Sequence, residues 1–234
     1  MEVFLHAESW IALATLTFLE IVLGIDNIIF ISLVSGRLPE HRQPFARNLG
    51  LALALFVRIG MLLGISWIIG FQDALFTVTG FAVSGKDLIM FGGGAFLLAK
   101  STSEIHGKIE GAHHEKTAMG KNSLSSVVMQ IVTLDIVFSF DSILTAVGMT
   151  NQLILMITAV VISIVVMMFF SGAISRFVNK HLTLQVLALA FLILIGFMLI
   201  VEGLHIHVPK AYIYFAVAFS LAVELVNMRV RKGK

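Results

Sequence analysis

Residues 20–29 read EIVLGIDNII, and residues 135–144 read DIVFSFDSIL. These two acidic motifs share one pattern in register: an acid, an apolar pair, a second acid six positions on, a small polar residue and another apolar pair. Each motif lies inside a long apolar run of the sequence. A carboxylate at the centre of a bilayer costs at least ~2.5 kcal/mol on insertion scales. The placement of these acids therefore decides both the fold and the function that the sequence predicts.

The composition indicates a membrane protein. Of the 234 residues, 58% are hydrophobic and 13% are charged, whereas soluble domains have about 45–50% and about 25%. A membrane-spanning helix needs about 20 predominantly apolar residues. We therefore expect an all-α membrane protein with seven transmembrane helices. The seven apolar runs lie at residues 9–34, 48–70, 87–99, 124–148, 153–177, 184–201 and 211–228.

The positive charges are distributed unevenly between the two sides of these predicted spans. Thirteen of the 16 Lys and Arg residues fall on one side, Lys86 and Lys210 fall on the other, and Arg58 lies inside the second run. Because Lys and Arg concentrate on the cytoplasmic side, we expect a multi-pass protein of the bacterial inner membrane with an external N-terminus and a cytoplasmic C-terminus. The polar residues 101–123, which include several His and Glu, are expected to form a cytoplasmic loop, either simply solvated or weakly metal-sensing.

The two acidic motifs are separated by 115 residues, which indicates an internal repeat. If the repeated unit holds three spans, the second copy enters the membrane from the opposite side, and such inverted repeats place a substrate site near the midplane. We expect a single transmembrane domain, residues 1–234. It comprises repeat 1 at about 9–100, the loop at about 101–123, repeat 2 at about 124–203 and a seventh helix at about 211–229.

Four acids occupy the predicted spans: Glu20, Asp26, Asp135 and Asp141. They are expected to face the interior of the helix bundle, because four unpaired acids facing lipid would cost upwards of ~10 kcal/mol. Arg58 is the one cation inside a run, and one arginine does not balance four acids. Bound protons, water or a cation can meet the remaining deficit.

The spacing within each motif sets which side chains share a face. Residues seven apart lie within about 20° on a helix, so Glu20 shares a face with Asn27, and Asp135 shares one with Ser142. The second acid of each motif points about 120° away. Either the two acids of a helix flank the site along a pathway, or a local break turns both toward one centre. The candidate break points are Gly24 and Ser139.

The available ligands are all oxygen atoms, from carboxylates, the Asn27 amide, the Ser142 hydroxyl and backbone carbonyls. Such a set suits Mg, Ca or Mn, with a slight preference for Mn because Mg sheds water reluctantly. The chain has no Cys, which disfavours zinc and copper. Two alternatives stay open: the acids join helices through Arg58 and bound protons, or they form a proton relay without metal.

Other features carry weaker predictions. Lys100 and Glu104 are four apart and form either an exposed ion pair or part of a gate. Gly92–Gly94 indicates close helix packing. The sequence has no catalytic triad, metalloprotease or nucleotide-loop motif, so we expect neither an enzyme nor a permanently bound cofactor. The net charge of +2 gives no reason to expect a nucleic acid partner, and the oligomeric state is open.

Five stretches of the chain resemble the TerC family of integral membrane proteins, named for tellurium resistance, and the resemblance covers residues 9–227. It rests on both acidic motifs and on three further stretches. These are residues 86–94, with KDLI and the three glycines, residues 100–106, KSTSEIH, and residues 207–214, HVPKAYIY.

The resemblance implies a fold and a function. The TerC family belongs with the LysE-type exporters, and its relatives include manganese exporters and exporters that load secreted enzymes with manganese. It therefore implies a secondary transporter that exports a divalent cation, with manganese as the best candidate. An organic-solute exporter of the LysE type and a non-transporting membrane scaffold are the alternatives. Some relatives carry a cytoplasmic regulatory domain after the last span, and we expect a short form without one. The implied ion-site residues are Glu20, Asp26, Asn27, Asp135, Asp141 and Ser142. Independently of the resemblance, the positions of Arg58, Lys100 and Glu104 make them candidates for tuning or gating.

Overall fold

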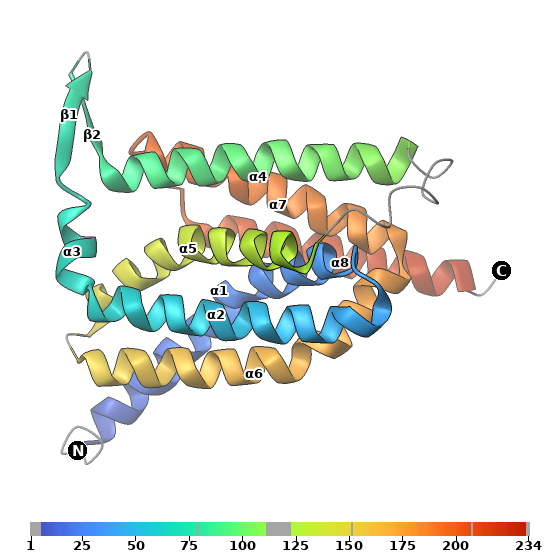
Figure 1. Cartoon of the computed structure of the whole chain (residues 1–234), viewed down its shortest axis with the longest axis horizontal. Helices are drawn as coiled ribbons and strands as arrows, with labels where there is room; N and C mark the ends of the chain where they lie inside the picture. Colours follow the sequence, from blue (N-terminus) through green and yellow to red (C-terminus); the bar gives the residue numbers. More distant parts are fainter. Residues whose placement is uncertain (1–5, 79, 111–122, 151, 207, 233–234) are drawn as a thin grey trace. The chain divides into compact units, whose positions relative to one another are not determined.

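The computed structural model describes residues 6–78, 80–110, 123–150, 152–206 and 208–232, and most of them are helical (Figure 1). The elements in chain order are α1 (Ala7–Ser35), η2 (Glu40–Arg42), α2 (Gln43–Leu63), α3 (Ile65–Gly70), β1 (Ala74–Val78), β2 (Phe81–Ser84), α4 (Gly85–Glu110), α5 (Leu124–Met149), α6 (Leu153–Lys180), α7 (Leu182–Gly203) and α8 (Lys210–Lys232).

Six helices among the described residues are long and apolar enough to cross a membrane: α1, α2 with η2, α5, α6, α7 and α8. Their lengths and apolar character agree with an all-α membrane protein. The third predicted span lies in α4, which is not among the six. Its apolar part, residues 87–99, is short and is bounded by charged residues on both sides. Seven spans and the inverted repeat therefore stay predictions.

The second predicted span is divided at Gly64. Helix α2 ends at Leu63, where the Gly64 N–H donates to the Gly60 carbonyl at 2.9 Å, and the short helix α3 follows. Helix α2 also begins earlier than the apolar run, at Gln43, because Pro44 fits the first turn of a helix, where its missing N–H leaves no bond unmade. The run at 48–70 is thus two helices rather than one.

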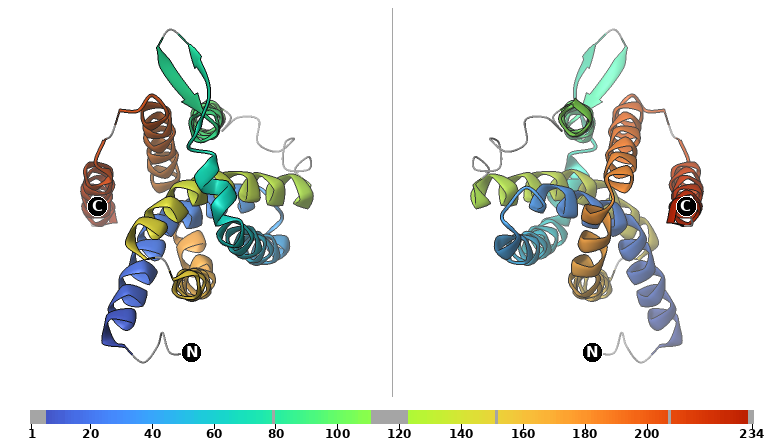
Figure 2. Two further views of the ribbon diagram at one scale, coloured as in Figure 1. Left: turned by 90° about the vertical axis from the view of Figure 1, so that its left-hand side faces the viewer. Right: turned by 90° about the vertical axis from the view of Figure 1, so that its right-hand side faces the viewer.

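A β-hairpin departs from the expectation of an all-α chain. Strands β1 and β2 pair antiparallel, and Gly80 between them has a φ of +87°, which glycine adopts without strain. The hairpin projects away from α3 (Figures 1 and 2). Its β-branched and aromatic residues around a glycine are a hairpin signal, which falls between two of the predicted apolar runs.

The predicted cytoplasmic loop at 101–123 is shorter than expected. Helix α4 continues through residues 101–110, so this part of the predicted loop is helical. Residues 111–122, with His113, His114 and Glu115, lie outside the described residues.

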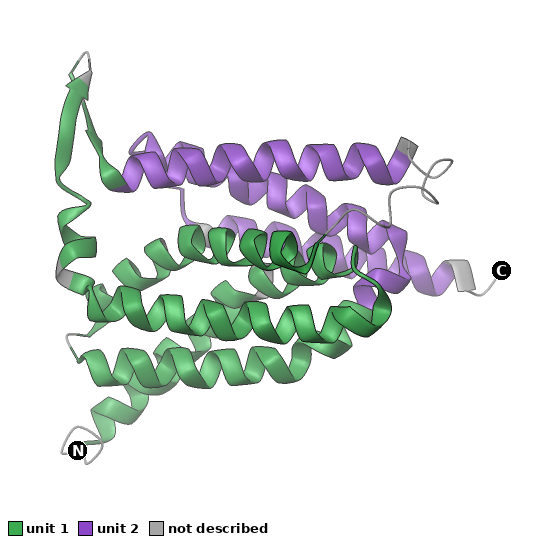
Figure 3. Ribbon diagram, viewed as in Figure 1, with its two compact units in different colours: residues 1–85, 121–176 green, residues 86–120, 177–234 purple. Residues whose placement is uncertain are grey.

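The elements fall into two compact units (Figure 3). Unit 1 comprises residues 1–85 and 121–176, and so contains α1, α2, α3, the hairpin, α5 and most of α6. Unit 2 comprises residues 86–120 and 177–234, with α4, α7 and α8. The first two helices of each predicted repeat thus belong to unit 1, and the third helix of each belongs to unit 2.

The distribution of side chains in unit 1 is inverted relative to a soluble protein. Glu20, Arg58 and Asp135 are buried, whereas Phe56 and Phe169 are 71% and 81% exposed. Soluble proteins almost never bury charged residues fully unless they are paired, and they rarely expose large apolar patches. This pattern is expected where the surroundings of the helices are lipid.

Unit 2 contains a close helix crossing that depends on two glycines. A Cβ added to Gly94 of α4 would lie 2.5 Å from the Gly196 carbonyl oxygen of α7, and one added to Gly196 would lie 2.9 Å from the Gly94 carbonyl oxygen. The predicted packing role of Gly92–Gly94 is therefore seen at Gly94, since small residues let helix backbones approach closely in membranes.

We expect Gly94→Ala to destabilise the protein by about 1–3 kcal/mol, because the methyl group meets backbone that cannot move independently. The midpoint of thermal unfolding in detergent measures this effect. Gly92→Ala is the matched control, since a Cβ at Gly92 meets nothing within 4 Å. Equal midpoints for the two variants would contradict the role assigned to the crossing.

Candidate functional site

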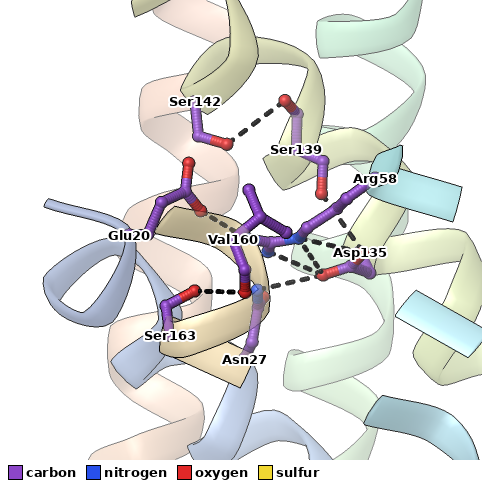
Figure 4. A network of polar contacts seen from close by, with 8 residues as sticks. All are labelled: Glu20, Asn27, Arg58, Asp135, Ser139, Ser142, Val160 and Ser163. Atoms are coloured by element: carbon purple, nitrogen blue, oxygen red, sulfur yellow. Dashed lines mark hydrogen bonds and ion pairs between the residues drawn. The ribbon is translucent and has the colours of Figure 1, made fainter. Parts of the chain in front are cut away.

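The centre of unit 1 is a guanidinium held between two carboxylates (Figure 4). Arg58 of α2 is 2% exposed, and its Nη1 donates to Glu20 Oε2 of α1 at 2.6 Å. Its Nη2 donates to Asp135 Oδ1 of α5 at 2.8 Å, and its Nε lies 3.2 and 3.3 Å from the two Asp135 oxygens. One arginine thus joins the first acids of both motifs, which come from helices far apart in the sequence.

Asp135 accepts further hydrogen bonds beyond those from Arg58. Asn27 Nδ2 of α1 donates to Asp135 Oδ1 at 3.2 Å, and Ser139 Oγ donates to Asp135 Oδ2 at 3.2 Å. Charge-assisted hydrogen bonds of this kind are about twice as strong as neutral ones. Asp135 is consequently held in one orientation from three helices.

The two motifs are arranged reciprocally. Asn27, seven residues after Glu20, donates to Asp135, whereas the Ser142 hydroxyl, seven residues after Asp135, donates to the Ser139 carbonyl at 3.3 Å and lies beside the Glu20 carboxylate (Figure 4). Helices α1 and α5 run in opposite directions (Figure 1), so the polar residue of each motif meets the first acid of the other. The shared helix face expected from the seven-residue spacing is present in both motifs.

Two buried serines near these groups were not predicted as site residues. Ser139 was considered only as a helix break, yet its hydroxyl binds Asp135. Ser163 of α6 is fully buried, and its hydroxyl donates to the Val160 carbonyl at 2.8 Å beside the network (Figure 4). Ser163 is the one serine within the apolar residues 153–170, and this is the sequence signal that could have found it.

The second acid of each motif has a described backbone but not a described side chain. Asp26 is in α1 and Asp141 is in α5, both within continuous helix. Their side chains, two of the six in the predicted ion site, lie outside the described part of the structure. Their roles as ligands stay predictions.

The helix breaks considered at Gly24 and Ser139 are absent, since α1 and α5 run through both positions. Gly24 has a different role: a Cβ there would overlap the Met167 sulfur of α6. Glycine at this position therefore leaves room for the Met167 side chain against α1, a role that the sequence pattern alone does not distinguish from a break.

The described charges at this site do not balance. Glu20 and Asp135 carry two negative charges when ionised, and Arg58 carries one positive charge. Oxygen atoms from these acids, from Asn27 and from Ser142 are of the type that binds hard divalent cations. Among the described residues, no group of three or more His, Asp or Glu is arranged to hold a metal ion.

Two ion pairs join described residues of unit 2, which are distant from this network in the sequence. Lys100 Nζ is 3.5 Å from Glu104 Oε1, and both side chains are partly exposed, as expected for a surface pair one helical turn apart; a part in gating stays a prediction. His205 Nε2 is 3.0 Å from Asp87 Oδ2, and Asp87 is buried. His205 has a φ of +61°, so its backbone is in the left-handed region.

Comparison with known proteins gives a family match over nearly the whole chain. The sequence profile described as "Integral membrane protein TerC family" matches residues 5–233. A UPF0053 protein of Haemophilus influenzae is 52% identical over 226 residues, which cover 96% of this chain and 95% of that protein. No solved structure matches the chain.

Two proteins of Escherichia coli K12 are similar at nearly the same level. The UPF0053 inner membrane protein YgdQ is 50% identical over 221 residues, covering 94% of this chain and 93% of its own length. The UPF0053 inner membrane protein YoaE is 47% identical over 234 residues, which are all of this chain but only 45% of YoaE.

Proposed function

Because the chain belongs to the TerC family of integral membrane proteins, we propose that it is a secondary transporter that exports a divalent cation across the bacterial inner membrane. We propose manganese as the transported ion. The N-terminus is external and the C-terminus is cytoplasmic, in the orientation that the distribution of Lys and Arg favours.

One observation carries the proposal: Arg58 is buried between Glu20 and Asp135, at 2.6 and 2.8 Å, where the two acidic motifs meet. Buried ionisable residues inside membrane helices are costly and mark ion pathways. When both are ionised, two carboxylates with one arginine leave a net negative charge, which favours the binding of a cation. The contribution of one acid from each motif fits a site between two repeats.

In the proposed mechanism Arg58 acts as the resident counter-ion. An arriving divalent cation takes carboxylate oxygens of Glu20 and Asp135, which releases the guanidinium from at least one of them. Asn27 and Ser142 supply neutral oxygens to the cation, and Asp26 and Asp141 are proposed as further ligands. Rocking of one repeat against the other then exposes the site to the opposite side of the membrane.

The same carboxylates provide a proposed route for proton coupling. Acids that release a cation can take up protons, so that export would draw on the proton gradient. The test measures manganese transport into liposomes with and without a proton gradient. Equal rates would contradict proton coupling but not the proposal that the protein transports manganese.

One observation favours a second candidate, an exporter of organic cations. The two carboxylates hold a planar guanidinium, which is the chemistry that a substrate with a guanidinium or ammonium group would use in place of Arg58. This candidate predicts efflux of a basic amino acid, such as arginine, rather than a change in cellular manganese.

Cellular metal content tests the proposal. A strain deleted for the gene is complemented with the wild type, Glu20→Gln, Asp141→Ala or Glu40→Gln, and each strain is exposed to manganese. We expect raised manganese in the deletion strain and with the first two variants. Glu40→Gln is the matched control because it removes an acid from an exposed position in η2, and it should restore normal manganese. Unchanged manganese in the deletion strain would overturn manganese export.

A further inference from the structure

Unit 1 contains a second buried arginine, Arg47, one turn into α2. Arg47 is 7% exposed, and its Nη1 donates to the Ser175 hydroxyl of α6 at 3.4 Å. Its Nε is buried and has no hydrogen-bond partner. A buried donor without a partner loses its hydration without compensation, so this guanidinium has unused binding capacity.

A second positive charge lies close to Arg47. Arg176, near the end of α6, interacts repulsively with Arg47, and the two guanidinium groups meet beside Gly172. A point at the position of a Gly172 Cβ would lie 3.6 Å from Arg176 Nη1 and 3.6 Å from Arg47 Nη2. Among the described residues, neither arginine forms an ion pair with a carboxylate.

Arg58, eleven residues further along α2, shows the contrast. Its buried guanidinium is matched by two carboxylates, whereas Arg47 has a hydroxyl, an orphaned Nε and another arginine. Buried charges are stable when they are paired and hydrogen-bonded. The pair Arg47–Arg176 is thus suited to a ligand that carries negative charge and several acceptor oxygens.

We propose that Arg47 and Arg176 bind a phosphate group, with the Ser175 hydroxyl beside it and Gly172 leaving room for it. Guanidinium groups bind phosphate through paired N–H donors, and two of them beside one small residue can hold one phosphate from two directions. This site is separate from the proposed transport site and does not depend on the identity of the transported substrate.

Two sources can supply this phosphate. Arg47 is in the first two turns of α2 and Arg176 is in the last two turns of α6, which is the depth of lipid headgroups if both helices span the bilayer. Basic pockets between membrane helices bind anionic headgroups. In the predicted orientation this end of both helices is cytoplasmic, so the first source is an anionic phospholipid of the cytoplasmic leaflet. The second source is a soluble phosphate compound.

The test uses the purified full chain, delipidated in detergent, with two probes. In the first arm, native mass spectrometry measures retention of phosphatidylglycerol as the lipid is titrated. In the second arm, inorganic phosphate is titrated and the thermal unfolding midpoint is recorded. The variants are Arg176→Gln, which changes an exposed side chain, and Arg47→Gln. Lys180→Gln, one turn further along α6, is the control for a general loss of positive charge.

We expect Arg176→Gln to weaken binding about tenfold, which corresponds to losing one charge-assisted interaction. A loss in the lipid arm identifies a headgroup, and a loss in the phosphate arm identifies a soluble phosphate compound. Arg176→Lys should restore part of the binding, because lysine keeps the positive charge but lacks the paired N–H donors of a guanidinium group. Unchanged binding by Arg176→Gln in both arms, or an equal loss in Lys180→Gln, would overturn the proposal even if Arg47→Gln fails to fold.

Discussion

Arg58→Met is expected to destabilise the protein by about 3–5 kcal/mol, the cost of breaking a buried ion pair by removing one partner. Methionine is an unbranched side chain without charge, shorter than arginine, so the buried carboxylates of Glu20 and Asp135 lose their common partner. The unfolding midpoint in detergent, measured on the purified chain, gives the change.

A compensated variant separates charge from packing. In the triple variant Glu20→Gln, Arg58→Met, Asp135→Asn no buried charge of the trio is left, and replacing a buried ionic group by neutral residues of similar volume is often neutral or stabilising. We therefore expect the triple variant to recover most of the stability lost in Arg58→Met. If it is as unstable as the single variant, the arginine acts through its packing and not as a counter-ion.

Asp135→Asn is expected to abolish transport while leaving the fold largely intact. The substitution keeps an acceptor for Arg58 and for Asn27, and it leaves Arg58 paired one to one with Glu20 at 2.6 Å. It removes the charge that favours a cation, so manganese efflux from loaded cells should fall to the level of the deletion strain.

The control for this variant is Asp73→Asn, which makes the same change at an exposed position between α3 and β1. Efflux by Asp73→Asn should match the wild type. Wild-type efflux by Asp135→Asn, at equal protein level in the membrane, would show that the buried acid serves only to join helices.

The helices were predictable because each of the seven apolar runs is long enough to form one, and every run contains a helix of the structure. Their ends were less predictable. Helix α2 ends before Gly64 and helix α4 extends to Glu110. These ends depend on local backbone hydrogen bonds, which the hydropathy of the sequence does not reveal. The β-hairpin was missed because it falls between runs, where only turn and strand signals apply.

The pairing of the two motifs was predictable in part, because buried acids from different spans need a common centre. The sequence pointed to Glu20, Asp135 and Arg58, and the structure places these three within hydrogen-bond distance. Ser139 and Ser163 were not predicted as site residues, because a serine in an apolar run is a weak signal that does not say which group its hydroxyl binds. Arg47 and Arg176 are among the thirteen Lys and Arg residues that the sequence places on the cytoplasmic side. Their approach was not predictable, because it depends on how α2 and α6 pack.

Manganese flux into proteoliposomes tests the central claim most directly. The purified wild type and the triple variant Glu20→Gln, Arg58→Met, Asp135→Asn are reconstituted at equal density, and a manganese-quenched dye inside the vesicles reports entry. We predict rapid quenching with the wild type and quenching no faster than in protein-free vesicles with the triple variant. Equal rates for the two proteins, or a wild type no faster than protein-free vesicles, would contradict a cation site built from Glu20 and Asp135 of the two acidic motifs.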